Sequence, residues 1–111
     1  MKREIKFRAW GGLPNQMIEN VPTGTIYIFG KKGEPIHASG CIFMQYTGLL
    51  DKNGKEIYES DYLGGLVRGL VEWTGSGFYI ARHIPIYDLS QKFSDVEIIG
   101  NIYENSELLS G

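Results

Sequence analysis

Apolar and polar side chains alternate along residues 4–10, and this alternation predicts a half-buried β-strand. Its apolar face consists of Ile5, Phe7 and Ala9. Its opposite face carries the remaining four side chains: Glu4, Lys6, Arg8 and Trp10. Further runs of β-branched, aromatic and aliphatic residues predict strands at 17–21, 25–29, 42–47, 49–50, 56–58, 61–63, 66–73, 78–81 and 96–99.

Several of these segments carry specific expectations. Residues 25–29 are apolar at every position but the first, so we expect both faces of this strand to be covered. Residues 66–73 predict the longest strand, with a bulge or bend at Gly69. Residues 34–40 have no clear period and predict a loop, whereas short helical turns are expected at 88–93 and 106–109.

The strongest turn signal is the sequence Asp-Lys-Asn-Gly-Lys at residues 51–55. Asn53 and Gly54 both tolerate the positive φ that a type I′ hairpin turn requires. This turn is expected to join residues 49–50 to the strand at 56–58.

Short strands at close spacing, without a long amphipathic helix, predict a mainly β protein. An antiparallel barrel and a sandwich both fit. The small closed barrel is favoured at this length because closure removes sheet edges. No linker or internal repeat divides the 111 residues, so we expect one domain over residues 1–111.

Composition agrees with strands joined by tight turns. Glycine accounts for 15 of the 111 residues, nearly twice the usual ~7%, and most glycines fall between predicted strands. Aromatic residues make up 13% of the chain, which is more than one small core needs. We therefore expect some Tyr and Trp side chains at the surface, where they favour interfaces.

The formal net charge of −2 hides an asymmetry between the two ends of the chain. Residues 1–40 carry six Lys or Arg and three Glu, a net +3, and residues 41–111 carry five Lys or Arg and ten Asp or Glu, a net −5. These opposite charges either attract a partner or pair with each other within the folded chain. The total charge does not favour general nucleic-acid binding, which requires a basic face.

The sequence restricts the cellular location of the protein and the disulfides that it can form. No stretch approaches the roughly 20 apolar residues of a membrane helix, and no apolar run of a signal peptide follows the basic N-terminal segment. The single cysteine, Cys41, excludes an internal disulfide. We therefore expect a cytoplasmic protein with no membrane partner.

Motifs of metal and phosphate sites are incomplete. Residues 51–62 begin like a calcium-binding loop, yet Glu56 stands where the bend needs Gly, and Tyr62 where a bidentate Glu belongs. One Cys and two His are too few for a structural zinc site. The glycines at 64–69 precede a strand, whereas a phosphate loop precedes a helix. We expect neither metal nor cofactor.

Catalytic constellations are equally sparse. Cys41 with His37 or His83 is a conceivable thiol–imidazole pair, although a buried cysteine is the ordinary alternative. Glu59 and Asp61 share a face if this segment is extended, which makes them a candidate acidic patch or a solvated rim. We expect no enzymatic activity.

The best candidate contact surface is the polar face of the first strand, where Trp10 lies beside Lys6 and Arg8. Trp and Arg are enriched where proteins bind partners, and a basic surface with an aromatic ring also suits nucleic acid. Packing of Trp10 beneath the following glycine loop is the alternative interpretation.

Three segments together closely resemble the YopX family of small phage and prophage proteins. They are Ile-Lys-Phe-Arg-Ala-Trp at residues 5–10, the long run from Met44 through the 51–55 turn to Asp61, and Val-Glu-Ile-Ile-Gly-Asn-Ile-Tyr-Glu-Asn at residues 96–105. The segments cover nearly the full chain in the family's order. Gly11 stands where the family usually has Asp, Ser60 where it has Gly, and Ser106 where it has Pro.

The resemblance implies a phage or prophage genome, a bacterial host cytoplasm, and a β-rich, SH3-like core with a tendency to self-associate. It implies no assigned activity and supplies no catalytic residue. The leading hypothesis is a non-enzymatic interaction or self-assembly module whose partner is itself, as a homo-oligomer, or a phage or host protein. The alternative is a nucleic-acid-associated accessory protein that uses its N-terminal basic residues and Trp10.

Overall fold

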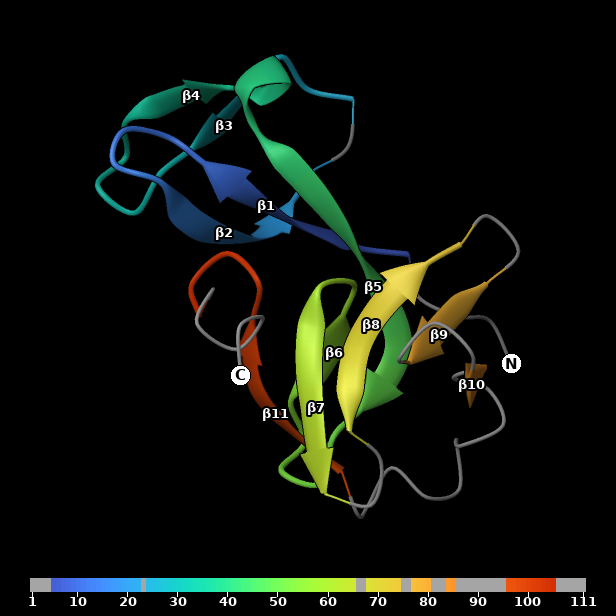
Figure 1. Cartoon of the computed structure of the whole chain (residues 1–111). Coiled ribbons are helices and arrows are strands. Elements are labelled where there is room, and N and C mark those ends of the chain that lie inside the picture. Colours follow the sequence, from blue (N-terminus) through green and yellow to red (C-terminus); the bar gives the residue numbers. More distant parts are fainter. Residues whose placement is uncertain are drawn as a thin grey trace. The chain divides into compact units, whose positions relative to one another are not determined.

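A computed structural model describes residues 5–22, 24–65, 68–74, 77–80, 84–85 and 96–105. These residues form strands β1 to β11 and one 3-10 turn, η1 (Figure 1). The strands pair in an antiparallel manner, so the prediction of a mainly antiparallel β protein is confirmed. Within the described part of the chain, no helix is long and apolar enough to cross a membrane.

The chain divides into two compact units, Met1–Tyr46 and Thr47–Gly111. The boundary lies within strand β5 (Ile42–Leu50), whose first half belongs to the N-terminal unit and whose second half belongs to the C-terminal unit. No separate linker therefore joins the two units.

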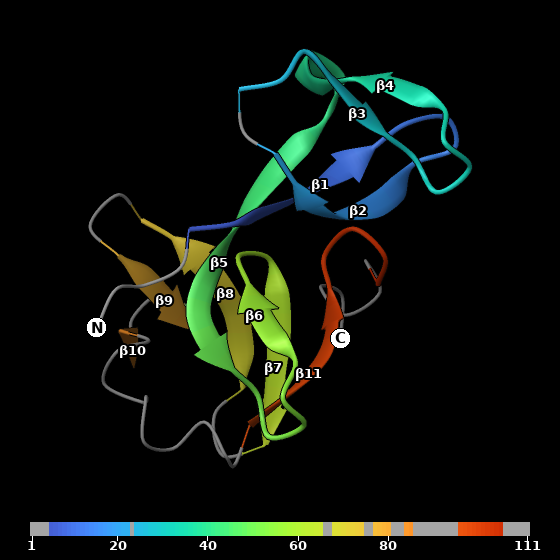
Figure 2. The same ribbon diagram turned by 180° about the vertical axis from the view of Figure 1, so that it is seen from behind.

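In the N-terminal unit, β1 (Phe7–Gly11) lies between β2 (Gln16–Val21) and the first half of β5 (Figure 2). The β1–β2 register shifts between Phe7 and Ala9, so β2 contains an extra residue, and Asn20 adopts a φ of 53° there. Asn is one of the few residues that tolerates this left-handed conformation.

A short hairpin made of β3 (Tyr27–Phe29) and β4 (Pro35–His37) completes this unit, followed by η1 (Ala38–Gly40). Ile28 and Ile36 pair across the hairpin and are buried in a cluster with Ala9 and Val21. The prediction of a loop over residues 34–40 is wrong, because Ile36 supplies one buried anchor to a strand too short to show a period.

In the C-terminal unit, the second half of β5 pairs with β6 (Glu56–Tyr58). A separate sheet has the order β10-β9-β8-β7-β11. Its strands are β7 (Asp61–Gly65), β8 (Gly69–Trp73), β9 (Phe78–Ile80), β10 (Ile84–Pro85) and β11 (Val96–Asn101). The buried cluster of this unit consists of Ile57, Leu63, Val71, Phe78, Ile80 and Val96.

The turn at residues 51–55 joins β5 to β6 as the sequence predicts, but with different geometry. Gly54 donates its N–H to the Asp51 carbonyl at 3.0 Å, and Asp51 donates to the Lys55 carbonyl at 2.8 Å. Only Gly54, with φ of 79°, adopts a positive φ in this turn. It is therefore a three-residue hairpin loop with a glycine bulge, not the predicted type I′ turn.

Two further expectations meet a different outcome. The longest described strand is β5, with nine residues, whereas β8 begins only at Gly69. The strand at 25–29 is covered on one face only, because Tyr27 and Phe29 are exposed. The helical turns expected at 88–93 and 106–109 lie outside the described residues.

Candidate interaction surface

The predicted contact surface on β1 is largely covered. Arg8 is only 6% exposed, and Lys6 and Trp10 are half-buried. The Lys6 ammonium lies 5.5 Å from the centre of the Tyr46 ring, a cation–π distance. β1 is not the expected half-buried strand, because it is an inner strand of its sheet and buries both Arg8 and Ala9. A partner could not reach most of the Arg8 side chain in this structure.

The two members of the predicted acidic patch differ in how far they are buried. Asp61 is 1% exposed, and its Oδ2 accepts the Tyr58 main-chain N–H at 2.8 Å. Glu59 is half-buried. Asp61 therefore closes the turn between β6 and β7, and Ser60 within that turn has a φ of 77°. A carboxylate that satisfies a buried main-chain donor is a structural group.

Other polar side chains of the motif segments also form hydrogen bonds with main-chain atoms. Asp51 Oδ1 accepts from the N–H groups of Asn53 at 2.8 Å and Lys55 at 3.0 Å, while its Oδ2 accepts from Ile98 at 3.0 Å. Burial alone raises the pKa of Asp51, but these donors and the Lys55 charge together outweigh burial and lower it. The Asp51 carboxylate thus ties the hairpin turn to β11.

Asn101 plays a similar part at the end of β11. Its Oδ1 accepts the N–H groups of Tyr103 at 3.0 Å and Glu104 at 2.8 Å, and its Nδ2 donates to Glu104 Oε1 at 2.8 Å. The Asn105 side chain accepts the Asn101 N–H at 3.1 Å. The conspicuous polar residues at this end of the sequence therefore shape the fold of the C-terminal unit.

Cys41 and His37 do not form a thiol–imidazole pair. The His37 Nδ1 atom lies 2.6 Å from the Ser39 hydroxyl, and the Cys41 thiol faces the His37 carbonyl at 3.7 Å. Burial raises the pKa of the Cys41 thiol, which opposes thiolate formation. His83 lies outside the described residues. The described residues contain no group of three His, Cys, Asp or Glu that could hold a metal ion.

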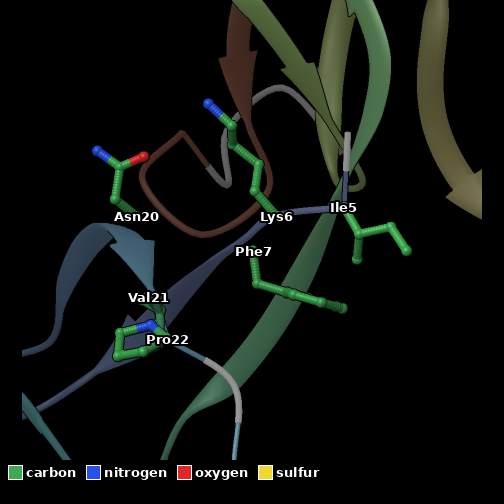
Figure 3. A pocket seen from close by; sticks show the side chains of 6 residues that line it. All are labelled: Ile5, Lys6, Phe7, Asn20, Val21 and Pro22. Atoms are coloured by element: carbon green, nitrogen blue, oxygen red, sulfur yellow. The ribbon is translucent and has the colours of Figure 1, made fainter. Parts of the chain in front are cut away.

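A groove of about 470 Å³ lies beside the bulge of β2 (Figure 3). Its lining residues come from two segments, 5–7 and 20–22. Figure 3 shows the Lys6 and Asn20 side chains projecting to one side and the Ile5 and Phe7 side chains to the other. The groove is open, its surface is polar and apolar in similar parts, and its Lys6 ammonium already faces the Tyr46 ring.

Among the described residues, the most exposed aromatic surface lies on the β3–β4 hairpin. Tyr27 and Phe29 are 53% and 63% exposed, and they lie opposite His37 and Pro35, which are also exposed. The Tyr27 and His37 rings meet edge to face at 5.2 Å. We name these four side chains the hairpin face. Sequence reasoning missed it, although Tyr-Ile-Phe and Pro-Ile-His each place one Ile between two outward residues.

Side-chain hydrogen bonds hold the tip of this hairpin, at residues 30–34. The Gln16 amide of β2 accepts the Lys31 N–H at 2.8 Å and donates to the Glu34 carboxylate at 3.1 Å. Glu34 accepts the Lys32 N–H at 3.0 Å. The main-chain N–H of Glu34 itself and the Gln16 amide lower the pKa of this carboxyl. The Lys31 and Lys32 residues remain exposed beside the hairpin face.

Comparisons with known proteins agree with the sequence motifs. Residues 6–110 match the model of the family described as YopX protein. The fold is similar to the crystal structure of protein EF1440 from Enterococcus faecalis, at 27% sequence identity and a TM-score of 0.74, over 97% of this chain and 99% of that one. None of the curated proteins compared with the chain matches it. Since the family model spans nearly every residue, the chain belongs to the YopX family.

Proposed function

We propose that this chain is a non-enzymatic interaction module and that the hairpin face is its contact surface. The module binds a second copy of itself or another macromolecule. The observation that carries the proposal is the exposure of two aromatic rings, Tyr27 and Phe29, on one face of a two-stranded sheet. Clustered exposed aromatic side chains mark binding surfaces, because they lose water-accessible area on contact.

The hairpin is built to present this face in a fixed conformation. Ile28 and Ile36 anchor its opposite face in the buried cluster with Ala9. The Gln16 side chain fixes the tip through the Lys31 main chain. A surface that is already ordered before binding loses less conformational entropy on contact, which favours affinity.

The non-enzymatic part of the proposal draws support from the polar side chains. The buried carboxylates Asp51 and Asp61 accept main-chain donors, and the Cys41 thiol is stabilised in its protonated form. These groups therefore stabilise the fold. The proposed setting, the cytoplasm of a bacterial cell that carries a phage or prophage, rests on the family alone.

Light scattering combined with affinity capture tests the proposal. The wild-type protein is expected to self-associate at high concentration or to retain a specific macromolecule, and Phe29→Ser is expected to abolish that association. Leu50→Ser is the matched control, because Leu50 is a 47% exposed apolar residue in the C-terminal unit. A monomeric wild-type protein that retains nothing, or a Phe29→Ser variant that associates like wild type, contradicts the proposal.

A further inference from the structure

We propose that the hairpin face binds single-stranded nucleic acid. This inference rests on the proposed function and names the partner class of the same surface. Proteins that bind single strands without strong sequence preference combine exposed aromatic rings, on which bases stack, with positive charges that contact the phosphates. Both elements occur together on this hairpin.

The aromatic element is a pair of rings on one strand. Tyr27 and Phe29 are two residues apart on β3 and point to the same side, so they are separated along the strand by about 7 Å. His37 contacts the edge of the Tyr27 ring, and Pro35 lies opposite Phe29. The two rings therefore form a short row of platforms on a supported sheet.

The positive element is the hairpin tip. Lys31 and Lys32 follow Phe29 after a single glycine, and both are exposed. The acidic residue of the tip, Glu34, directs its carboxylate at the Gln16 amide and the Lys32 main chain. Across the N-terminal unit, residues 1–46 contain six Lys or Arg and three Glu, a net +3. The excess of acidic residues falls in the sequence of the C-terminal unit, residues 47–111, and not in that of this hairpin.

Charge complementarity favours a polyanion over the other possible occupants. A second copy of the hairpin would bring two more lysines, whereas the one acidic residue of each tip, Glu34, already accepts from the Gln16 amide and the Lys32 main chain. A nucleic-acid duplex keeps its bases stacked inside, so it cannot offer them to Tyr27 and Phe29. A single strand offers phosphates to the lysines and unstacked bases to the rings.

The first measurement is fluorescence anisotropy of a labelled oligothymidylate of about 12 nucleotides at low salt, repeated over a salt series. The double substitution Lys31→Gln/Lys32→Gln is expected to reduce the slope of log K against log salt by about 1.4, since each lost contact to a single strand contributes about 0.7. The control variant Lys52→Gln/Lys55→Gln removes the same charge from the turn at residues 51–55 and is expected to leave the slope unchanged.

The second measurement separates stacking from ordinary apolar docking. Phe29→Ala and Phe29→Leu are both expected to weaken oligonucleotide binding about tenfold or more, because neither side chain offers a π-face. Phe29→Tyr is expected to retain binding. An apolar protein partner would tolerate leucine, so binding that survives Phe29→Leu contradicts the stacking account. Circular dichroism of each variant verifies that the hairpin variants are folded.

Three results overturn the inference: no binding of the wild-type protein at low salt, equal binding of a duplex of the same length, or binding that is insensitive to both the lysine and the Phe29 substitutions. These results leave the proposed function distinguishable. If Phe29→Ser abolishes self-association or protein capture while the oligonucleotide is not bound, the interaction module stands and the nucleic-acid partner falls.

Discussion

Replacing Asp51 with Asn tests whether the hairpin turn at residues 51–55 is held by a carboxylate. Asp51 is 5% exposed and accepts three main-chain N–H groups at 2.8–3.0 Å. In Asp51→Asn, the carboxamide keeps two of these bonds through its oxygen and turns its NH₂ group toward the Ile98 N–H. One charge-assisted bond is lost and two donors face each other, which costs about 2–4 kcal/mol of the free energy of unfolding.

Urea denaturation followed by tryptophan fluorescence measures this difference. Glu97→Gln is the matched control. Its exposed carboxylate lies 3.5 Å from the Lys52 ammonium, and losing such a surface pair costs at most about 0.5 kcal/mol. If Asp51→Asn unfolds at the wild-type urea concentration, or if Glu97→Gln is destabilised equally, the assignment of this role to Asp51 is refuted.

The pH dependence gives a second readout of the same group. The pKa of Asp51 is lower in the folded protein than its ordinary value, so the unfolded chain binds more protons as the pH falls. The stabilisation by Asp51 is therefore fully present above the unfolded pKa of about 4 and is lost as the pH falls through the folded value. The stability difference between wild type and Asp51→Asn is expected to shrink on acidification. A difference that is constant with pH contradicts the mechanism.

Three other substitutions have expected effects on the free energy of unfolding, all measured by the same assay. Ser60→Gly is expected to stabilise the protein by about 0.5–1 kcal/mol, because relief of the positive φ of 77° outweighs the added chain entropy. Gly11→Ala is expected to cost about 1–3 kcal/mol, since its Cβ would lie 2.6 Å from the Cys41 sulfur. Thr47→Val is expected to cost about 1–3 kcal/mol, because it removes the 2.7 Å hydroxyl bond to the Ile57 carbonyl.

Each of these expectations has a defined contradiction. Ser60→Ala keeps a Cβ at the strained position, so it must not reproduce the gain of Ser60→Gly. The double variant Gly11→Ala/Cys41→Ala must recover part of the lost stability, because the nearest clashing atom is the sulfur. A Thr47→Val variant that unfolds like wild type would show that the Ile57 carbonyl finds another donor.

Local patterns in the sequence predict most strands and the 51–55 turn because both arise from neighbouring residues. Gly54 adopts the positive φ that its residue type allows, and the turn joins the expected strands. The detailed turn type could not be predicted. It depends on Asp51 reaching both Lys55 and Ile98, and Ile98 is distant in sequence.

The candidate contact surface could not be predicted from the sequence, because the burial of a side chain depends on which elements pack against each face of its strand. The alternation along residues 4–10 places Arg8 on the polar face and predicts that it is exposed. Arg8 instead lies on an inner strand and is buried. Asp61 lies two residues after Glu59, a spacing that predicts an acidic patch, yet Asp61 is buried and accepts the Tyr58 N–H. Residues 25–29 are apolar on both faces, and only the packing of Ile28 against Ala9 shows that the Tyr27 and Phe29 face is the outer one.

The central claim, that the hairpin face is the contact surface, is tested most directly by amide chemical shifts in NMR. Spectra are recorded over a dilution series of the protein and during titration with the single-stranded oligonucleotide. The account predicts that the largest shift changes occur at Tyr27–Phe29 and at the amides of Ile36 and His37, with smaller changes at the 51–55 turn. Changes centred on Lys6, Arg8 and Trp10, with the hairpin amides unmoved, would contradict it.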